Sequence, residues 1–150
     1  MACLICSIVE GHKPSHMVYE DANTVAFLDV RPVAPGHTLL VPRTHVARLE
    51  DLTPEQAEAL FAALYRILNP VREAVGADAT TVGVNNGPGS GQEIQHVHIH
   101  IIPRHRGDGG GVIQSLGPGG RVDLTETAER IKKKIASMTK RSSDSNQQTG

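Results

Sequence analysis

Three histidines at alternate positions form the stretch of the chain with the clearest chemical potential. The segment reads His96-Val97-His98-Ile99-His100-Ile101-Ile102. Successive side chains of a β-strand point to opposite faces of the sheet, and valine and isoleucine favour strands. A strand over residues 96–102, closed by Pro103, therefore places the three imidazoles on one face and the intervening aliphatic side chains in a core.

These imidazoles could serve two kinds of chemistry. One metal ion could bind all three, but His96 and His100 lie about 13 Å apart on a strand that rises about 3.3 Å per residue. Neighbours two residues apart can share a metal, whereas all three on one straight strand would be badly stretched. A neutral imidazole with a pKa near its usual value of about 6.5 can instead act as a nucleophile or proton carrier. We favour divided roles for the three histidines.

A glycine-rich loop immediately precedes the histidines. A strand expected over residues 80–85 leads into it, and glycines stand at positions 87, 89 and 91. Glycine lets backbone amides approach an anion closely. Because the histidine strand follows within five residues of Gly91, the combination favours a phosphate site.

The segment Asn85 to Arg104 resembles the signature of the histidine triad (HIT) family of nucleotide hydrolases and transferases: Asn, a glycine-rich loop, Gly-Gln, then His-x-His-x-His and apolar residues. A second family pattern matches Phe27-Leu28-Asp29-Val30-x-Pro32-x-x-Pro35-Gly36-His37-x-Leu39-x-Val41-Pro42-x-x-His45. The resemblance extends over roughly residues 3–105 and is closest to small bacterial, zinc-containing members. It implies an α+β fold: a single HIT-like domain with an antiparallel sheet of about five strands, one main helix and a C-terminal helix.

The resemblance implies a hydrolase or transferase that acts on nucleoside 5′-phosphate derivatives, with purine nucleoside phosphoramidates as the model substrate. Within the triad of His96, His98 and His100, the middle histidine would attack phosphorus to give a covalent nucleotidyl-histidine, and His100 would stabilise the phosphate. Positioned donors would serve in place of a catalytic metal.

The resemblance also assigns the nucleotide contacts. Asn85 and Gln92 would hydrogen-bond phosphate oxygens, and the Asp29 carboxylate would accept from the ribose hydroxyls. The positions that match the family's base pocket are Ile5, Ile8, Phe27 and Val30.

Glu93 departs from the phosphoramidase pattern, which often has a small hydroxyl residue directly after the glutamine, near the leaving group. A carboxylate beside a phosphate is repulsive unless it is protonated or paired with an amine. The leaving group therefore stays open, with a dinucleoside polyphosphate hydrolase as the first alternative. A nucleotide-binding regulator with residual catalysis is the alternative from another class, and a purely structural zinc module is the third.

Cys3 and Cys6 form a Cys-x-x-Cys pair, which in a reducing compartment indicates metal binding or redox chemistry. A redox pair normally follows a strand, and position 3 leaves no room for one. Two thiolates are half of a tetrahedral zinc site, and since the chain has no other cysteine, histidines must complete it. The resemblance supplies His45 and His96, and we expect this zinc to be structural.

The remaining segments show local structure signals. Strands are expected at residues 17–20, 24–28 and 38–42. Thr53 and Gln56 form a capping box around Pro54, which starts the main helix. Pro70 should kink or break that helix near Asn69, and Gly76 should end it. We expect one domain over residues 1–140, with its core at about 3–105, a C-terminal helix at about 123–140 and a disordered tail at 141–150.

Bulk composition excludes several classes of protein. The 150 residues are enough for one ordinary core, and a net charge of −1 gives no general attraction to nucleic acid or membrane. Two phenylalanines, two tyrosines and no tryptophan argue against a stacking platform for single strands. We find neither a signal peptide nor a membrane span, and expect a cytoplasmic protein. The family expectation is a homodimer that binds a purine nucleotide and no nucleic acid.

Overall fold

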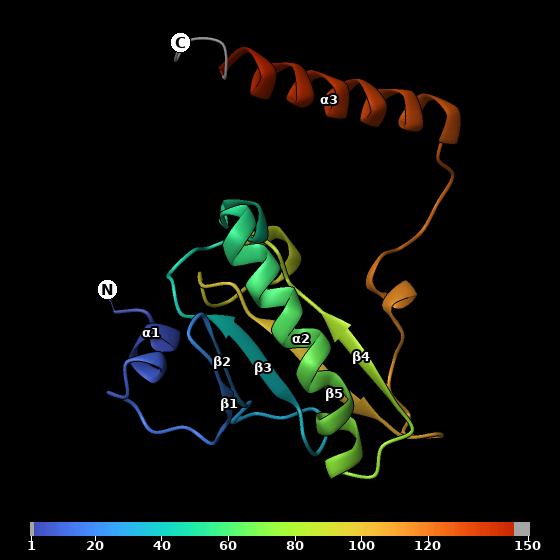
Figure 1. Ribbon diagram of the computed structural model, residues 1–150. Coiled ribbons are helices and arrows are strands. Elements are labelled where there is room, and N and C mark those ends of the chain that lie inside the picture. Colours follow the sequence, from blue (N-terminus) through green and yellow to red (C-terminus); the bar gives the residue numbers. More distant parts are fainter. Residues whose placement is uncertain (1, 146–150) are drawn as a thin grey trace. The chain divides into compact units, whose positions relative to one another are not determined.

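The computed structural model describes residues 2–145, with side chains as far as residue 138. The chain divides into two compact units, Met1–Gly111 and Val112–Gly150. The first unit contains α1 (Leu4–Val9), β1 (Met17–Glu20), β2 (Thr24–Leu28), β3 (Thr38–Pro42), η1 (Leu49–Asp51), α2 (Pro54–Ala74), β4 (Ala79–Gly83), η2 (Pro88–Ser90) and β5 (Ile99–Arg104). Its strands form one antiparallel sheet in the order β1-β2-β3-β5-β4 (Figure 1). The predicted α+β class, with an antiparallel sheet of five strands and one main helix, is confirmed.

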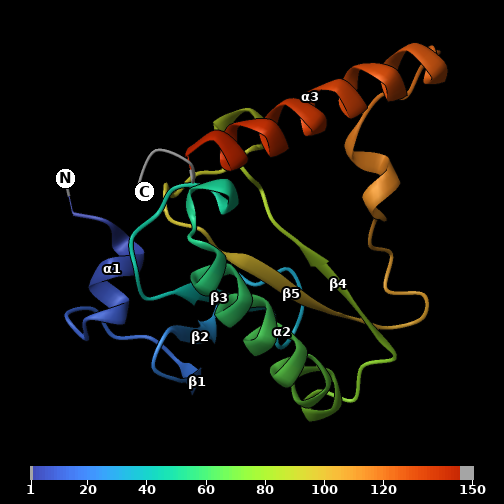
Figure 2. The same cartoon turned by 45° about the horizontal axis from the view of Figure 1, so that its top comes forward.

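The sheet separates two apolar clusters because side chains along β2 and β3 alternate between its faces. Ala26 and Leu40 join Leu60, Ala63 and Ile67 of α2, which lies along one face of the sheet in both views (Figures 1 and 2). The other cluster combines residues of α1 with alternate residues of the two strands: Ile5, Ile8, Val25, Phe27, Leu39 and Val41. The short helix α1, which the sequence did not predict, thus covers part of the second face.

The main helix begins as predicted. Thr53 Oγ1 accepts from the Gln56 amide at 3.2 Å, and Gln56 Oε1 accepts from the Thr53 amide at 2.9 Å. At its end, the amides of Gly76 and Ala77 donate to the carbonyls of Glu73 and Arg72, and Gly76 takes the left-handed φ of 64° that such an end favours.

The predicted break at Pro70 is wrong, because α2 continues through it to Ala74. Pro70 and Arg66 both lie on the exposed face of the helix. Water can therefore serve the Arg66 carbonyl that lacks an amide partner, and the buried face keeps its packing.

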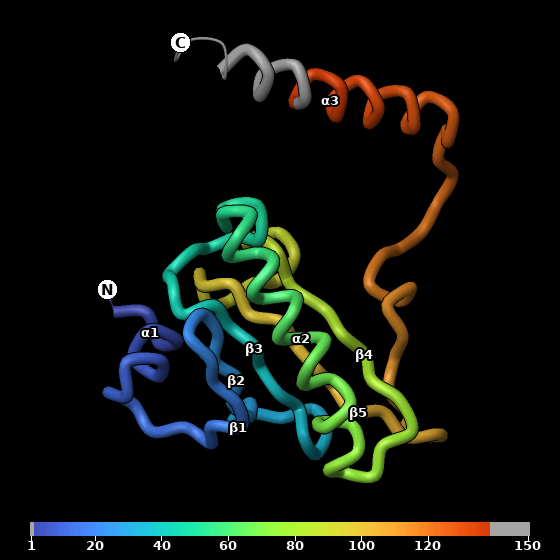
Figure 3. The backbone as a smooth tube through the Cα atoms, viewed as in Figure 1, coloured from blue at the N-terminus to red at the C-terminus, as the bar shows by residue number. Residues whose placement is uncertain are grey.

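β5 also differs from expectation. It begins at Ile99 rather than residue 96, and Pro103 lies inside it. β3 pairs with β5 over Ile99–Ile101, whereas Pro103 pairs with Thr80 of β4. At Pro103 the strand thus has a neighbour on one side, where a missing amide is tolerated. The tube in Figure 3 shows β3 and β5 running side by side although α2 and β4 separate them in the chain.

The second unit contains η3 (Ile113–Leu116) and α3 (Leu124–Ser145). Asp123 Oδ1 accepts from the Glu126 amide at 3.0 Å, which caps the helix where the sequence placed its start. α3 continues to Ser145, beyond the predicted end at residue 140, and the rest of the predicted tail lies outside the described residues. The assignment of this helix to the same domain as the sheet stays a prediction.

Among residues 2–145, no helix combines the length and apolar character that crossing a membrane requires. The cytoplasmic location and the exclusion of nucleic acid stay predictions.

Candidate active site

The triad retains its alternation although its first half is not regular strand. Val97 and Ile99 are both 1% exposed and Ile101 is fully buried, in the cluster beneath α2. The Val97 amide donates to the Val46 carbonyl at 2.8 Å, so a loop rather than β3 holds the chain here. The three histidines consequently share the opposite face of the sheet, as predicted, and this is the face that α1 partly covers.

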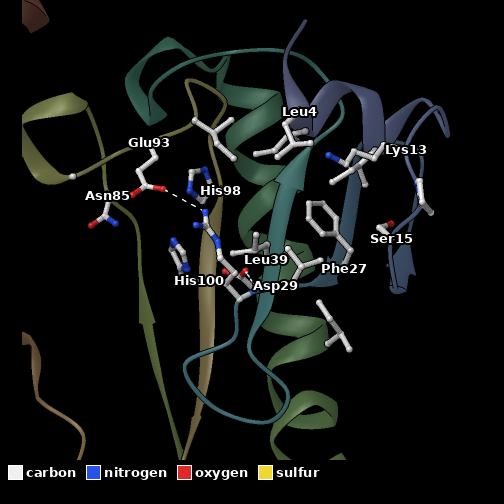
Figure 4. A pocket seen from close by; sticks show the side chains of 18 residues that line it. Leu4, Lys13, Ser15, Phe27, Asp29, Leu39, Asn85, Glu93, His98 and His100 are labelled. Carbon is white, nitrogen blue, oxygen red and sulfur yellow. Dashed lines mark hydrogen bonds and ion pairs between the residues drawn. The ribbon is translucent and has the colours of Figure 1, made fainter.

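His98 has its reactive tautomer fixed by the backbone. Its Nδ1 lies 2.7 Å from the His96 carbonyl oxygen. Because a carbonyl can only accept, Nδ1 carries the hydrogen, and Nε2 keeps a free lone pair. The side chain is 8% exposed and lines a cavity (Figure 4).

His100 is held by a fourth histidine, His37. The Val33 amide donates to His37 Nδ1 at 3.1 Å, so His37 carries its hydrogen on Nε2 and donates it to His100 Nδ1 at 2.9 Å. His100 Nδ1 is thus an acceptor, and its Nε2–H is available to a ligand. Sequence analysis gave His37 no role at the site, and at 4% exposure it is buried. The signal was its place in Pro-Gly-His directly before β3.

Burial keeps this pair of imidazoles neutral. Desolvation lowers the pKa of His37, and desolvation together with nearby His98 and His37 lowers the pKa of His100 to about 4, against an opposing effect of Asp29. Asp29 Oδ2 lies 3.6 Å from His37 Nε2. With His37 neutral, that contact is polar rather than an ion pair.

Acid should therefore destabilise the first unit through His37 and His100. Unfolded histidine titrates near about 6.5, whereas the folded pair resists protonation until lower pH. The unfolded chain then binds more protons, so the free energy of unfolding falls as pH falls from about 6.5 towards about 4. In His100→Asn, urea unfolding at several pH values should give a shallower dependence, by up to about 1.4 kcal/mol per pH unit. Equal slopes in the two proteins would contradict this.

The cavity has a volume of about 290 Å³ and opens between α1, the ends of β2 and β4, and the triad. It brings together the predicted nucleotide-binding residues except Gln92, namely Ile5, Ile8, Phe27, Asp29, Val30, Asn85, Glu93, His98 and His100. Figure 4 shows Phe27 on one side of His98 and Asn85 and Glu93 on the other. The cavity thus has an apolar end, the His98 imidazole in the middle and a polar end.

The structure does not bring Gln92 to the cavity. Its Oε1 accepts from the Gly87 amide at 2.8 Å, and its Nε2 donates to the carbonyls of Ala47 and Ile94 at 2.7 and 3.0 Å. The amide group is thus occupied by main chain on both sides. Gln92 thus fixes the glycine-rich loop, and its contact with a phosphate stays a prediction.

Asn86 supports the same loop from η1, which the sequence did not indicate. Its Oδ1 accepts from the Leu49 amide at 2.9 Å, and its Nδ2 donates to Glu50 Oε2 at 2.7 Å. Arg48 packs directly beneath the loop at Gly87. The loop is thereby braced before any ligand binds.

Gly87 should tolerate no side chain. Its φ is 98°, and a Cβ would meet the Arg48 guanidinium carbon at 3.1 Å. Gly87→Ala should therefore lower the free energy of unfolding by about 1–3 kcal/mol. Gly89 offers a matched control because a Cβ there meets nothing within 4 Å, and Gly89→Ala should cost less than about 0.5 kcal/mol. Urea denaturation measures both, and equal costs would refute the difference.

The predicted zinc ligands form a cluster. One donor atom each from Cys3, Cys6, His45 and His96 lies within 4.8 Å of the others. The sulfur-to-Nδ1 distances are 3.4 Å for Cys6–His45 and 3.6 Å for both Cys3–His96 and Cys6–His96. An edge of a tetrahedron with Zn–S of about 2.3 Å and Zn–N of about 2.0–2.1 Å is about 3.6 Å. The donor set fits a tetrahedral zinc ion.

The tautomer of His96 agrees with this fit. Its Nε2 lies 2.8 Å from the Pro42 carbonyl oxygen and so carries the hydrogen, which leaves Nδ1 bare towards the thiols. A backbone carbonyl that accepts from the other ring nitrogen commonly orients a histidine that binds a metal. Burial also lowers the pKa of His96, which favours the neutral ring a metal needs.

Asp29, His37 and His100 form a second cluster within 4.8 Å, but its hydrogen bonds oppose a metal. The Val33 amide already donates to His37 Nδ1, so the hydrogen must sit on Nε2, the atom a metal would need. We interpret this cluster as a hydrogen-bond chain that orients His100.

The fold and the row of imidazoles at a partly apolar cavity can be compared with known proteins. The family model described as HIT domain matches residues 10–107, and an uncharacterized HIT-like protein of Methanocaldococcus jannaschii is 38% identical over 87% of this chain and 98% of its own. The chain belongs to the histidine triad family, whose members are nucleotide hydrolases.

Solved structures show the same fold. A Streptococcus mutans protein superposes with a TM-score of 0.80 at 37% identity, covering 89% of this chain and 85% of that chain. A zinc-bound histidine triad family protein of Mycobacterium smegmatis has a TM-score of 0.69 at 33% identity, with coverages of 93% and 97%.

Two relatives have named activities. An adenylylsulfatase of Arabidopsis thaliana is 39% identical over 71% of this chain, and an asymmetrical bis(5′-nucleosyl)-tetraphosphatase of Schizosaccharomyces pombe is 36% identical over 63%. The matches span 54% and 52% of those two proteins, respectively, so this chain corresponds to about half of each.

Proposed function

We propose that this protein hydrolyses or transfers nucleoside monophosphates from nucleoside 5′-phosphate derivatives, with purine nucleoside phosphoramidates as model substrates. The observation that carries the proposal is the tautomer of His98. Its Nδ1–H is held by the His96 carbonyl at 2.7 Å, and its side chain lines the cavity. A bare Nε2 beside a phosphate-sized space is a nucleophile ready to attack.

The reaction proceeds in two displacements. His98 Nε2 forms a bond to the α-phosphorus, and the bond to the leaving group breaks. The leaving group departs with the electron pair and, if it is an amine, takes a proton from water at the open mouth. Water then attacks the nucleotidyl-histidine, which releases the nucleoside monophosphate and restores neutral His98. Transfer occurs when another nucleophile replaces that water.

Fixed donors stabilise the charge that develops on phosphorus oxygens. His100 offers its Nε2–H, since its Nδ1 already accepts from His37 at 2.9 Å. Asn85 and the amides of the glycine-rich loop complete the set. Because His37 in turn is held by the Val33 amide, the donor is oriented before the substrate arrives.

The rest of the cavity suits a nucleoside. Ile5 and Phe27, 1% and 3% exposed, offer apolar surface to a purine, and Asp29 offers an acceptor to the ribose hydroxyls. Asp29 Oδ1 already accepts from the Arg31 amide at 2.9 Å, which fixes the carboxylate.

We assign the Cys3, Cys6, His45 and His96 cluster to a structural zinc ion. Zinc here would supply no reaction chemistry. It would join α1, which forms one wall of the cavity, to the loop after β3 and to the start of the triad. With His96 committed to zinc, His98 and His100 remain for catalysis.

We also propose a homodimer that pairs through α2. Phe61 and Tyr65, one turn apart on the outer face of the helix, are 48% and 86% exposed. They are one of the two phenylalanines and one of the two tyrosines in the chain, and exposed large apolar side chains of this kind often mark interfaces. In sedimentation velocity, a dimer that dissociates on Tyr65→Glu would support this, and a wild-type monomer would refute it.

The bis(5′-nucleosyl)-tetraphosphatase relative favours a second candidate, hydrolysis of dinucleoside polyphosphates, which differs in its leaving group. Intact mass spectrometry after brief mixing with adenosine phosphoramidate tests the common step. We expect a transient gain of one adenylyl group in wild type and none in His98→Ala. Neither adduct nor AMP, also with a guanosine analogue and a dinucleoside polyphosphate, would refute an enzyme and favour a nucleotide-binding regulator.

A further inference from the structure

The polar end of the cavity holds two opposite charges whose roles are not yet assigned. Arg31, from the loop between β2 and β3, and Glu93, from the loop before the triad, both line the cavity. Their charged groups approach to 3.8 Å across its mouth, where the side chains are 86% and 82% exposed. Figure 4 shows Glu93 of this pair beside His98, with a dashed line that starts at its carboxylate.

The position of the pair identifies which part of a substrate it would meet. The apolar end, with Phe27, takes the base, and His98 stands in the middle at the phosphorus. Glu93 lies on the side of His98 away from Phe27 (Figure 4). Because the substrate must extend from base to phosphorus to leaving group, Arg31 and Glu93 meet the leaving group.

We propose that Arg31 is the binding site for an anionic leaving group, such as a sulfate, phosphate or carboxylate, and that Glu93 occupies it until the substrate arrives. This inference rests on the proposed function. An incoming anion replaces the Glu93 carboxylate on the guanidinium, which presents several donors to such groups. The negative charge of Glu93 in turn weakens the binding of any anion to Arg31.

The weakness of the ion pair supports this role. A pair this exposed contributes little to stability, so a substrate anion displaces Glu93 at small cost. Arg31 is nevertheless held in place at its backbone, since its amide donates to Asp29 Oδ1 at 2.9 Å. The Arg31 side chain therefore extends from a fixed backbone position on the rim of the cavity.

Three adenosine 5′-phosphoramidates with leaving groups of matched size test the proposal: those of β-alanine, propylamine and 1,3-diaminopropane. They carry a negative, neutral and positive group, respectively, on similar short chains. The measured quantity is kcat/KM for AMP release by wild type, Arg31→Gln and Glu93→Gln. Lys13→Gln is the matched control, because Lys13 is a cation that lines the same cavity at its apolar end (Figure 4).

We expect the ratio of kcat/KM for the anionic over the cationic substrate to fall about tenfold in Arg31→Gln and to rise about tenfold in Glu93→Gln. In Lys13→Gln it should stay within about twofold. Because exposed charges are screened, both shifts should shrink between about 0.05 and 0.5 M salt. Unchanged ratios, or shifts in the same direction in both variants, would overturn the proposal.

Failure of the proposed function gives a different result. Wild type would then release AMP from none of the three compounds. In that case calorimetry gives Kd values for the intact compounds, and the ratio of affinities for the anionic over the cationic compound replaces the ratio of kcat/KM. A fall of this ratio in Arg31→Gln and a rise in Glu93→Gln would still show that the pair distinguishes the charge of the bound group.

Discussion

Replacing His98 with alanine should lower kcat/KM for an adenosine phosphoramidate by at least about 10⁴-fold, because no other group can form the covalent intermediate. The imidazole is oriented by the His96 carbonyl and only 8% exposed, so its nucleophilic nitrogen is positioned in advance, which water in its place would not be. Steady-state release of AMP measures the loss. His100→Asn should lose less, about 10²-fold, since it removes one donor to the developing charge.

His12→Ala is the control for both variants, because the His12 side chain is 73% exposed and does not line the cavity. It should match wild type within about twofold, as surface substitutions usually do. If His98→Ala retained more than about one hundredth of the wild-type rate, His98 would not be the nucleophile. Circular dichroism should confirm that each variant is folded before rates are compared.

Loss of the zinc site formed by Cys3, Cys6, His45 and His96 should give the largest change in the free energy of unfolding. Inductively coupled plasma mass spectrometry of the purified protein should find about one zinc ion per chain. Cys6→Ala should lose that zinc and lower the free energy of unfolding by about 2–5 kcal/mol, as removal of a structural metal does. The reason is geometric: Cys6 Sγ lies 3.4 Å from His45 Nδ1 and 3.6 Å from His96 Nδ1, so it contacts two separate segments.

Ser7→Ala is the matched control in the same helix, since Ser7 Oγ donates only to the Cys3 carbonyl at 3.2 Å. It should lose less than about 1.5 kcal/mol, the value of one ordinary hydrogen bond. A strong chelator should lower the Tm of wild type towards that of Cys6→Ala and leave Cys6→Ala unchanged. Zinc-free protein with a Tm insensitive to added zinc would contradict a structural metal.

Local patterns in the sequence were sufficient to predict much of the fold. The period of two in the triad placed its aliphatic residues under α2 and its histidines on the other face, although regular strand begins only at Ile99. The capping box at Thr53 and Gln56 located the start of α2. These features depend on residues two or three positions apart, which is the range over which backbone periodicity and capping operate.

The failures have a common cause, which is a partner distant in sequence. Pro70 was expected to kink or break α2, but the helix continues through it, and Leu60, Ala63 and Ile67 pack on the sheet. Gln92 does not line the cavity, because its Nε2 donates to the Ala47 carbonyl, 45 residues away. Propensity and motif describe a residue's own segment, and tertiary contacts override both.

The sequence alone determined that three imidazoles share a face behind a glycine-rich loop, because a strand's alternation is a local property. Only the tertiary structure decided which partner each imidazole has and which tautomer it adopts. The pairing of Leu39 with His100 brings His37 to that histidine from 63 residues away, and the carbonyls of Pro42 and His96 set the tautomers of His96 and His98. A tautomer depends on which acceptor lies within hydrogen-bond reach, and that is known only once the strands have paired.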